Sequence, residues 1–435
     1  MSTHSHDHDD TTTSAETLVH HSDPTVRRSR STRRARRRRR RLRNLGVLVV
    51  VVAGWCAFAL LRPLPTPHVV AVLGPNEVIS GQPFRVAPSL GMEETVAVAG
   101  LGTVTSANAN TPTPVASLTK IMTALVILHD HPLTLGQNGP NLVVNAGDVA
   151  QYHLEKSRGD SVVAVHAGET LSELQALEAV LIPSADNVTQ LLAQWDAGTQ
   201  SAFVAKMNAL AQSIGARHTT YAGVSGVNPQ SVSTANDQLL IAQFAMRNPV
   251  FAGIVSMAQA TLPVAGVVYN VNADLGTDGI DGVKTGWLPQ SGGCVVIAAH
   301  HRVGTKNVSI LGVILGQQGL TPIPSVLRAA RHLVANLDAG LRVVTIKAGT
   351  TVENYDAANG QVIPLVTTSR IHILAMNGES LHVVTRLTKR ITTGLAAGTV
   401  VGSVTFTRGA QRTTSSLQLA TRFTGSTLWW RFTHV

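Results

Sequence analysis

The longest uninterrupted apolar stretch of the chain lies near its start, at Leu45–Leu61, and contains no charged residue. As a helix with a rise of about 1.5 Å per residue, this stretch would reach about 26 Å, close to the thickness of a bilayer's hydrocarbon core. Arg43 and Arg62 border it and can extend their guanidinium groups to the headgroups on either side. The pattern therefore predicts a transmembrane helix over residues 45–61.

After a linker at residues 62–86, short β-branched runs alternate with helical patterns over residues 87–338, as is typical of an α/β or α+β domain. Val115–Leu128 is apolar on more than one helical face, which predicts a helix buried on most sides. The same reasoning gives the other elements of this domain. Helices are expected at Leu171–Ile182 and Val188–Trp195, and buried strands at Val295–Ala299 and Val308–Leu315.

The pattern changes after residue 338, where short Thr- and Val-rich runs are separated by Gly, Asn and Asp turns. Such runs at short spacing predict a small all-β, sandwich-like domain over residues 339–435. Strands are expected at Val343–Ile346, Ile371–Met376, Leu381–Arg386, Val400–Thr407, Ser416–Ala420 and Trp429–Thr433.

The positive charge of the protein is concentrated in its N-terminal tail. The chain has a net charge of +10, and twelve arginines lie between Arg27 and Arg43. Residues 63–435 are nearly neutral, which argues against a specific nucleic-acid partner. The positive-inside rule places residues 1–44 in the cytoplasm, as a disordered basic tail beside anionic headgroups, and the body outside the cell membrane.

Two other interpretations of the apolar stretch are weaker. A cleaved signal peptide would be followed by a small-x-small cleavage site, whereas the sequence continues as the stiff, proline-rich Arg62–Pro67. A buried core helix fits the length but not the preceding arginines. Cys56 lies within the span and Cys294 is the other cysteine, so no intrachain disulfide is expected outside the membrane.

Three short motifs of the outer part could perform chemistry together. Ser117 and Lys120 lie three residues apart on one helical face, where a buried amine can take the hydroxyl proton. The Ser184–Asp186 loop and the Lys284–Gly286 segment follow in that order, the latter with a cation, a hydroxyl and a glycine. Each motif alone also fits a bland structural role, such as a helix cap or a hairpin turn. Their order and spacing are what distinguish them.

With these motifs the sequence resembles the serine-type D-alanyl-D-alanine carboxypeptidases, the low-molecular-mass penicillin-binding proteins. The likeness extends over roughly residues 90–335. It includes Pro114–Leu125, Tyr221–Gly226, Ser233–Leu239, Tyr269–Asn272 and Asp281–Trp287. The resemblance implies a DD-peptidase/β-lactamase-like fold, peptidoglycan stem peptides as substrate, β-lactams as inhibitors, and neither cofactor nor metal.

The resemblance also implies a role for each matching residue. Ser117 would be the acylated nucleophile, Lys120 its general base, and Ser184 a proton relay to the leaving D-alanine. Substrate binding would fall to Lys284, Thr285 and Gly286, together with Asp186 or Asn187. The backbone N–H groups of Ser117 and Trp287 would form the oxyanion hole.

The sequence departs from the family's pattern at Asp186, where an asparagine is usual. An ionised Asp186 cannot donate a hydrogen bond and would pair with Lys120 or Lys284, which weakens Lys120 as a base. Asn187 follows directly and could supply the amide instead. The departure leaves open a catalytically impaired wall-binding or scaffold protein. A β-lactamase is disfavoured because no Glu-x-x-Leu-Asn stretch lies between Ser184 and Lys284.

Overall fold

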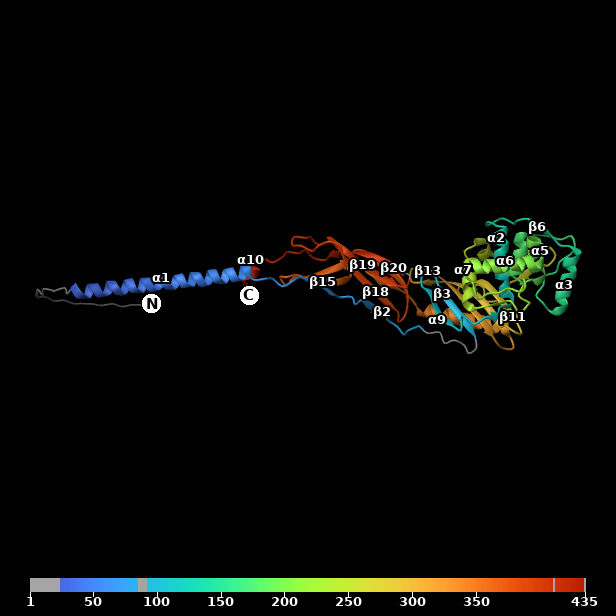
Figure 1. Cartoon of the computed structure of the whole chain (residues 1–435), viewed down its shortest axis with the longest axis horizontal. Helices are drawn as coiled ribbons and strands as arrows, with labels where there is room; N and C mark the ends of the chain where they lie inside the picture. The colour runs from blue at the N-terminus through green and yellow to red at the C-terminus, as the bar shows by residue number, and fades with distance from the viewer. Residues whose placement is uncertain (1–23, 85–91, 410, 434–435) are drawn as a thin grey trace, which may run out of the picture. The chain divides into compact units, whose positions relative to one another are not determined.

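The computed structural model describes residues 24–84, 92–409 and 411–433, which form two compact units (Figure 1). The first unit holds the described residues up to His68, residues 356–361 and those from Thr424 onward. The second holds residues 69–355 and 362–423 and contains all the candidate catalytic residues.

The first unit is dominated by one long helix, α1, at Pro24–Leu61. Its Ala35–Leu61 portion is long and apolar enough to cross a membrane, and almost none of it is covered by the rest of the protein. The arginines from Arg27 to Arg43 belong to this helix, so the expectation of a disordered tail is wrong from Pro24 onward; residues 1–23 lie outside the described residues. Arginine has a high helix propensity, and an existing helix extends more easily than a new one forms.

A five-stranded antiparallel sheet organises the catalytic part of the second unit. Its strand order is β11 (Ile280–Leu288), β12 (Gly292–Val303), β13 (Lys306–Gln317), β3 (Glu93–Val98) and β4 (Gly102–Ala107). Alternate residues of β12 enter two different hydrophobic clusters, with Val296 in one and Ile297 in the other. Both faces of the sheet are therefore buried, which explains the continuous apolar run of β12.

Helices cover both faces of this sheet (Figure 1). The helix α9 (Pro322–Gly340) packs on β12 and β13 within one hydrophobic cluster. The other cluster contains α2 (Thr119–Asp130), whose residues from Thr119 to Leu128 are all buried, as the apolar pattern predicts. The other helices of this part are α3 (Ala146–Arg158), α4 (Glu173–Leu181), α5 (Asp186–Ala197), α6 (Gln200–Ser213), α7 (Ala235–Ala245) and α8 (Pro249–Val255).

Three two-stranded ladders lie among these helices. They pair β5 (Thr113–Pro114) with β8 (Val232–Ser233), β6 (Asn141–Val143) with β7 (Thr170–Ser172), and β9 (Gln259–Leu262) with β10 (Gly266–Tyr269). The first ladder ends directly before the Ser117 turn, so it fixes where the nucleophile segment begins.

The C-terminal part is a β-sandwich, as expected from the sequence. A seven-stranded sheet has the order β1, β15, β16, β20, β19, β18, β2, and a second sheet pairs β14 with β17. The strands are β1 (His68–Ala71), β2 (Asn76–Val78), β14 (Leu341–Ile346), β15 (Thr351–Asp356), β16 (Val362–Thr367), β17 (Ile371–Met376), β18 (Ser380–Leu387), β19 (Val400–Arg408) and β20 (Gln411–Leu419).

Two expectations for this part are wrong. The expected linker at residues 62–86 contains β1 and β2, which add strands to the edges of the seven-stranded sheet. The expected strand at Trp429–Thr433 lies in a short helix, α10 (Leu428–Thr433), which contacts α1 within the first unit. Its Arg431 donates a hydrogen bond to the carbonyl of Leu60. A six-residue run with two tryptophans is compatible with a strand or a helix, and here it forms a helix that packs against α1.

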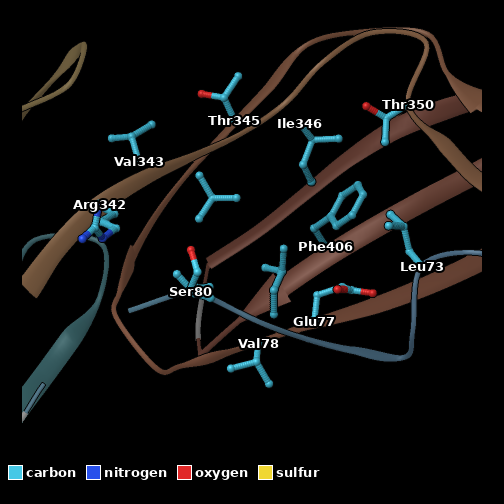
Figure 2. Close-up of a pocket in the computed structure, with 13 residues that line it drawn as sticks. Leu73, Glu77, Val78, Ser80, Arg342, Val343, Thr345, Ile346, Thr350 and Phe406 are labelled. Atoms are coloured by element: carbon cyan, nitrogen blue, oxygen red, sulfur yellow. The ribbon is translucent and has the colours of Figure 1, made fainter. Parts of the chain in front are cut away.

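A cavity of about 470 Å³ opens within the sandwich (Figure 2). It lies between β14 and the segment that carries β2, and the side chain of Phe406 points into it from β19. None of the residues that line this cavity belongs to the motifs identified above. The candidate catalytic residues therefore lie elsewhere, on the five-stranded sheet of the second unit and the helices that cover it.

Candidate active site

The candidate nucleophile lies on a tight turn. Ala116 has a φ of 47°, in the left-handed region, and Ser117 follows it in a single 3₁₀ turn, Ala116–Leu118, before α2 begins at Thr119. Gly226 makes this turn possible: a Cβ there would lie 1.9 Å from the Ala116 carbonyl oxygen. The turn leaves Ser117 half-buried and directs the next helical turn, with Lys120, into the core.

Lys120 is completely buried, and its amine has three hydrogen-bond acceptors. Nζ lies 2.9 Å from Ser117 Oγ, 2.7 Å from Asp186 Oδ1 and 2.9 Å from the carbonyl oxygen of Ser225. An ammonium has three N–H donors, so this set satisfies the charged form in full. A neutral amine would donate to Asp186 and Ser225 and present its lone pair to the Ser117 hydroxyl.

The loop between α4 and α5 carries Ser184 and leads directly to Asp186, whose carboxylate reaches the Lys120 amine. Ser184 has a φ of 68°, and its buried Oγ has no hydrogen-bond partner among the described residues. Asp186 is the first residue of α5 and contributes the carboxylate that binds Lys120. A strained serine with an unused hydroxyl is the kind of feature that proteins keep at functional sites.

The structure distinguishes the two candidate residues at the start of α5. Asn187 is turned to the backbone of Val163: its Oδ1 accepts from the Val163 N–H at 3.1 Å, and its Nδ2 donates to the Val163 carbonyl at 3.0 Å. Both polar atoms of the amide are thus occupied away from Lys120. Of the alternatives that the sequence left open, Asp186 is the one at the lysine.

The Lys284–Gly286 segment lies in β11, an edge strand of the five-stranded sheet. Gly286 approaches the nucleophile so closely that a Cβ there would lie 2.8 Å from the backbone nitrogen of Ser117. Trp287 follows and is 47% exposed. Glycine is therefore required for β11 to run beside the turn that carries Ser117.

Lys284 is 2% exposed, and its Nζ donates to the carbonyl of Thr285 at 3.1 Å. Burial holds the pKa of the Lys284 amine well below its usual range, and the positive charge of Lys120 lowers it further, whereas Asp186 acts in the opposite direction. A buried amine with one neutral acceptor is suited to bind an anion that enters the site.

Sequence reasoning missed the third partner of Lys120, the Ser225 carbonyl. The loop that carries it is held by the Thr123 hydroxyl, which donates to the Val224 carbonyl at 2.6 Å. It is also held by Asn208, which donates to the Tyr221 carbonyl at 2.9 Å. The sequence feature that could have indicated this contact is Thr123, a polar residue one turn after Lys120 in the otherwise apolar run 121–128.

A second missed group is Glu155, on α3. Its side chain is buried, and burial raises its pKa to about 7, with the negative charges of Asp186 and Asp160 adding to the effect; the hydrogen bond from Gln151 and the charge of Lys120 oppose it.

Across the described parts of the chain, no group of three or more His, Cys, Asp and Glu is placed to hold a metal ion.

The helices and sheet around Ser117 form the α/β fold of the DD-peptidases. The sequence model of the D-alanyl-D-alanine carboxypeptidase family (peptidase S11) matches residues 100–319, just over half of the chain. The protein belongs to this family. The matched region contains Ser117, Lys120, Ser184 and Lys284.

Curated relatives carry the same family name. A carboxypeptidase of Mycobacterium tuberculosis is 36% identical over 157 residues, which are 35% of this chain and 50% of the relative. A carboxypeptidase of Streptomyces strain K15 is 29% identical over 241 residues, 50% of this chain and 76% of the relative. The chain matches about half of the first relative's length.

Solved structures show the same fold. Penicillin-binding protein 5 of Haemophilus influenzae superimposes with a TM-score of 0.55 at 20% identity, covering 79% of this chain and all of that one. The DD-transpeptidase of Streptomyces K15 gives a TM-score of 0.51 at 24% identity, covering 59% of this chain and 99% of that one. The likeness to penicillin-binding protein 5 therefore covers more of this chain than the likeness to the K15 enzyme does.

Proposed function

We propose that this protein is a membrane-anchored serine D-alanyl-D-alanine carboxypeptidase, which removes the terminal D-alanine from peptidoglycan stem peptides through an acyl-Ser117 intermediate. The observation that carries the proposal is the contact of 2.9 Å between Ser117 Oγ and the buried amine of Lys120. Family membership supports the substrate class.

In the first step, the neutral amine of Lys120 takes the Ser117 hydroxyl proton while Oγ attacks the carbonyl carbon of the penultimate D-alanine. The developing oxyanion is stabilised by the backbone N–H groups of Ser117 and Trp287. The close packing of Gly286 on the Ser117 turn supports this part of the proposal, because it brings the two backbone segments together.

Substrate is held by its terminal carboxylate. Lys284 and Thr285 of β11 take this role: the buried Lys284 amine donates to the carboxylate, whose negative charge offsets the burial that lowers the pKa of the lysine, and Thr285 contributes a hydroxyl donor. When the C–N bond breaks, the proton on Lys120 passes to the departing amine through the Ser184 hydroxyl. The unused hydrogen-bonding capacity of Ser184 supports this role. Water then hydrolyses the acyl-enzyme, with Lys120 again as base.

The Asp186 carboxylate restrains the base. A buried carboxylate at 2.7 Å stabilises the ammonium form of Lys120, which has no lone pair for the Ser117 proton. We therefore expect acylation at neutral pH to be slower than it would be with an asparagine at this position. The same contact is the observation that favours the second candidate function, a catalytically impaired protein that binds peptidoglycan.

For localisation, we propose that residues 45–61 of α1 cross the cell membrane, with the N-terminus in the cytoplasm and the catalytic and β-domains outside. The apolar, uncovered Ala35–Leu61 portion of α1 and the arginines at its start support this topology. We place the catalytic domain at residues 87–338 and the β-domain at 339–435, with β1 and β2 contributed by the preceding segment.

A fluorescent penicillin tests the two candidate functions against each other. A carboxypeptidase forms a covalent adduct with it that survives denaturation, and it releases D-alanine from a synthetic stem pentapeptide. An impaired binding protein retains peptidoglycan in a pull-down but gives neither adduct nor D-alanine. The control is the Ser117→Ala variant, which removes the acylated atom and leaves the rest of the site in place.

A further inference from the structure

Two acids besides Asp186, Glu155 and Asp160, belong to the segment around the end of α3, which packs against the first turns of α5. The backbone N–H of Asp186 donates to the Ser161 carbonyl at 2.7 Å, so the residues after α3 lie against the first turn of α5. Within this segment, Glu155 is on α3 and Asp160 follows the helix. Glu155 accepts a hydrogen bond from Gln190, which lies one turn after Asp186 on α5.

Glu155 is 3% exposed, and its Oε1 accepts from the amides of Gln151, at 2.9 Å, and Gln190. Its Oε2 is buried without a hydrogen-bond partner among the residues that the structure describes. The charged groups that act on it are the acids Asp186 and Asp160 and the cation Lys120. A buried carboxylate in these surroundings is costly to ionise.

We propose that Glu155 is a positioning residue for the base: when ionised, it adds negative charge beside Asp186, which favours the Lys120 ammonium and slows acylation. The inference rests on the proposed function, because it concerns the rate at which Ser117 is acylated. The added negative charge near Lys120 favours its ammonium form, and Ser117 Oγ then accepts a hydrogen bond instead of giving up its proton.

The effect depends on pH within the physiological range. Burial raises the pKa of Glu155 to about 7, so the group is largely neutral at pH 5.5 and largely ionised at pH 8.5. As pH rises through this range, Glu155 ionises, and the negative charge it adds beside Asp186 favours the Lys120 ammonium more than at low pH. The wild-type acylation rate should therefore rise less steeply above pH 7 than it would without this group.

The test measures acylation by a fluorescent β-lactam from pH 5.5 to 8.5 in the full-length protein. Glu155→Gln keeps the shape and both amide contacts at Oε1 but cannot ionise. Its rate should equal that of the wild type at pH 5.5 and exceed it about fivefold at pH 8.5. The matched control is Glu173→Gln, because burial alone raises the pKa of Glu173 to about 7 and no charged group of the site acts on it.

Equal rates of Glu155→Gln and wild type across the whole range would overturn the proposal, as would the same change in Glu173→Gln. Asp160→Asn, at a less buried position, is a second variant for the case in which Glu155→Gln does not fold. It also removes a negative charge and should speed acylation about twofold. An unchanged rate would count against the proposal. A wild-type protein that no β-lactam labels at any pH would overturn the proposed function and this role with it.

Discussion

The carboxylate of Asp186 lies 2.7 Å from the amine of Lys120, and both side chains are buried. The amine is at the same time 2.9 Å from the hydroxyl of Ser117, so one group links the acid to the nucleophile. The position that distinguishes this chain from the usual family pattern is therefore in direct contact with the proposed base. The effect of Asp186 on the reaction follows from this contact.

Replacement of Asp186 by asparagine should speed acylation by a β-lactam about tenfold at neutral pH, because it removes the charge that favours the Lys120 ammonium. The measurement is the acylation rate against pH. Asn187→Ala is the control: it breaks two hydrogen bonds to the Val163 backbone and should reduce stability while leaving the rate per folded molecule unchanged.

An unchanged rate in Asp186→Asn would show that the carboxylate does not restrain the base. A rate lost in Asn187→Ala but unchanged in Asp186→Asn would contradict the placement of Asp186 at the lysine and assign the role to Asn187.

Substitution of Gly226 by alanine should displace the nucleophile. A Cβ at this position would lie 1.9 Å from the Ala116 carbonyl oxygen, and the φ of 88° is unfavourable for alanine. We expect a loss of roughly 3 kcal/mol in the free energy of unfolding and at least about a tenfold loss in acylation rate.

Gly168→Ala is the matched control for this prediction, because Gly168 has a φ of 87° and no atom within 4 Å of the added Cβ. It should cost about 1 kcal/mol and leave acylation unchanged. Equal losses in the two variants, measured by urea unfolding and by labelling, would attribute the effect to backbone conformation and not to the contact with Ala116.

The buried side chain of Glu173 should make the stability of the protein depend on pH. The side chain is fully buried, neither carboxylate oxygen has a partner among the described residues, and burial raises its pKa from 4.5 to about 7. The folded state thus favours the protonated acid, so its contribution is intact below about pH 4.5 and is lost as pH rises through 7. The free energy of unfolding of Glu173→Gln relative to the wild type should therefore increase by roughly 2 kcal/mol between pH 4.5 and pH 8.5.

The measurement is urea unfolding of both proteins at the two pH values. The difference in unfolding free energy between the variant and the wild type at pH 8.5 is compared with the same difference at pH 4.5. A constant offset at both pH values would mean that the cost of the buried amide, and not the ionisation of Glu173, accounts for the change.

The proposed topology predicts a protection pattern. With the arginines between Arg27 and Arg43 on the cytoplasmic side, protease added to intact cells with a permeable wall should digest the catalytic and β-domains. An N-terminal epitope tag should stay protected until the membrane is opened. Degradation of the tag with survival of the body would reject the orientation, and release of an untagged soluble body would indicate a cleaved signal peptide.

Much of the site was predictable because its chemistry is encoded locally. The spacing of Ser117 and Lys120 follows from helical geometry, and the order of the Ser184 and Lys284 motifs completes the pattern. The Ser225 carbonyl was not predictable, because every residue has such a group and only tertiary packing selects one. Glu155 was missed for a similar reason, since nothing in the sequence of α3 indicates that this carboxylate faces α5.

The fold divides in the same way. Strands with a strong β-branched pattern, such as Ile371–Met376, have the predicted bounds. In contrast, β15 and β16 were not anticipated, since polar residues such as Glu353 and Asn354 interrupt the apolar pattern of the first. The pairing of β1 and β2 with a sheet formed almost 300 residues later depends on contacts that no local pattern encodes.

Peptide-level mass spectrometry of the β-lactam-treated protein identifies the residue that carries the acyl group, which we propose is Ser117. The protein is treated with penicillin, quenched in acid and digested, alongside Ser117→Ala and Ser184→Ala variants. We expect one adduct on the peptide that contains Ser117, no adduct in Ser117→Ala, and slower formation of the adduct at Ser117 in Ser184→Ala. A covalent adduct that persists in Ser117→Ala, or that maps to another residue in the wild type, would show that Ser117 is not the nucleophile.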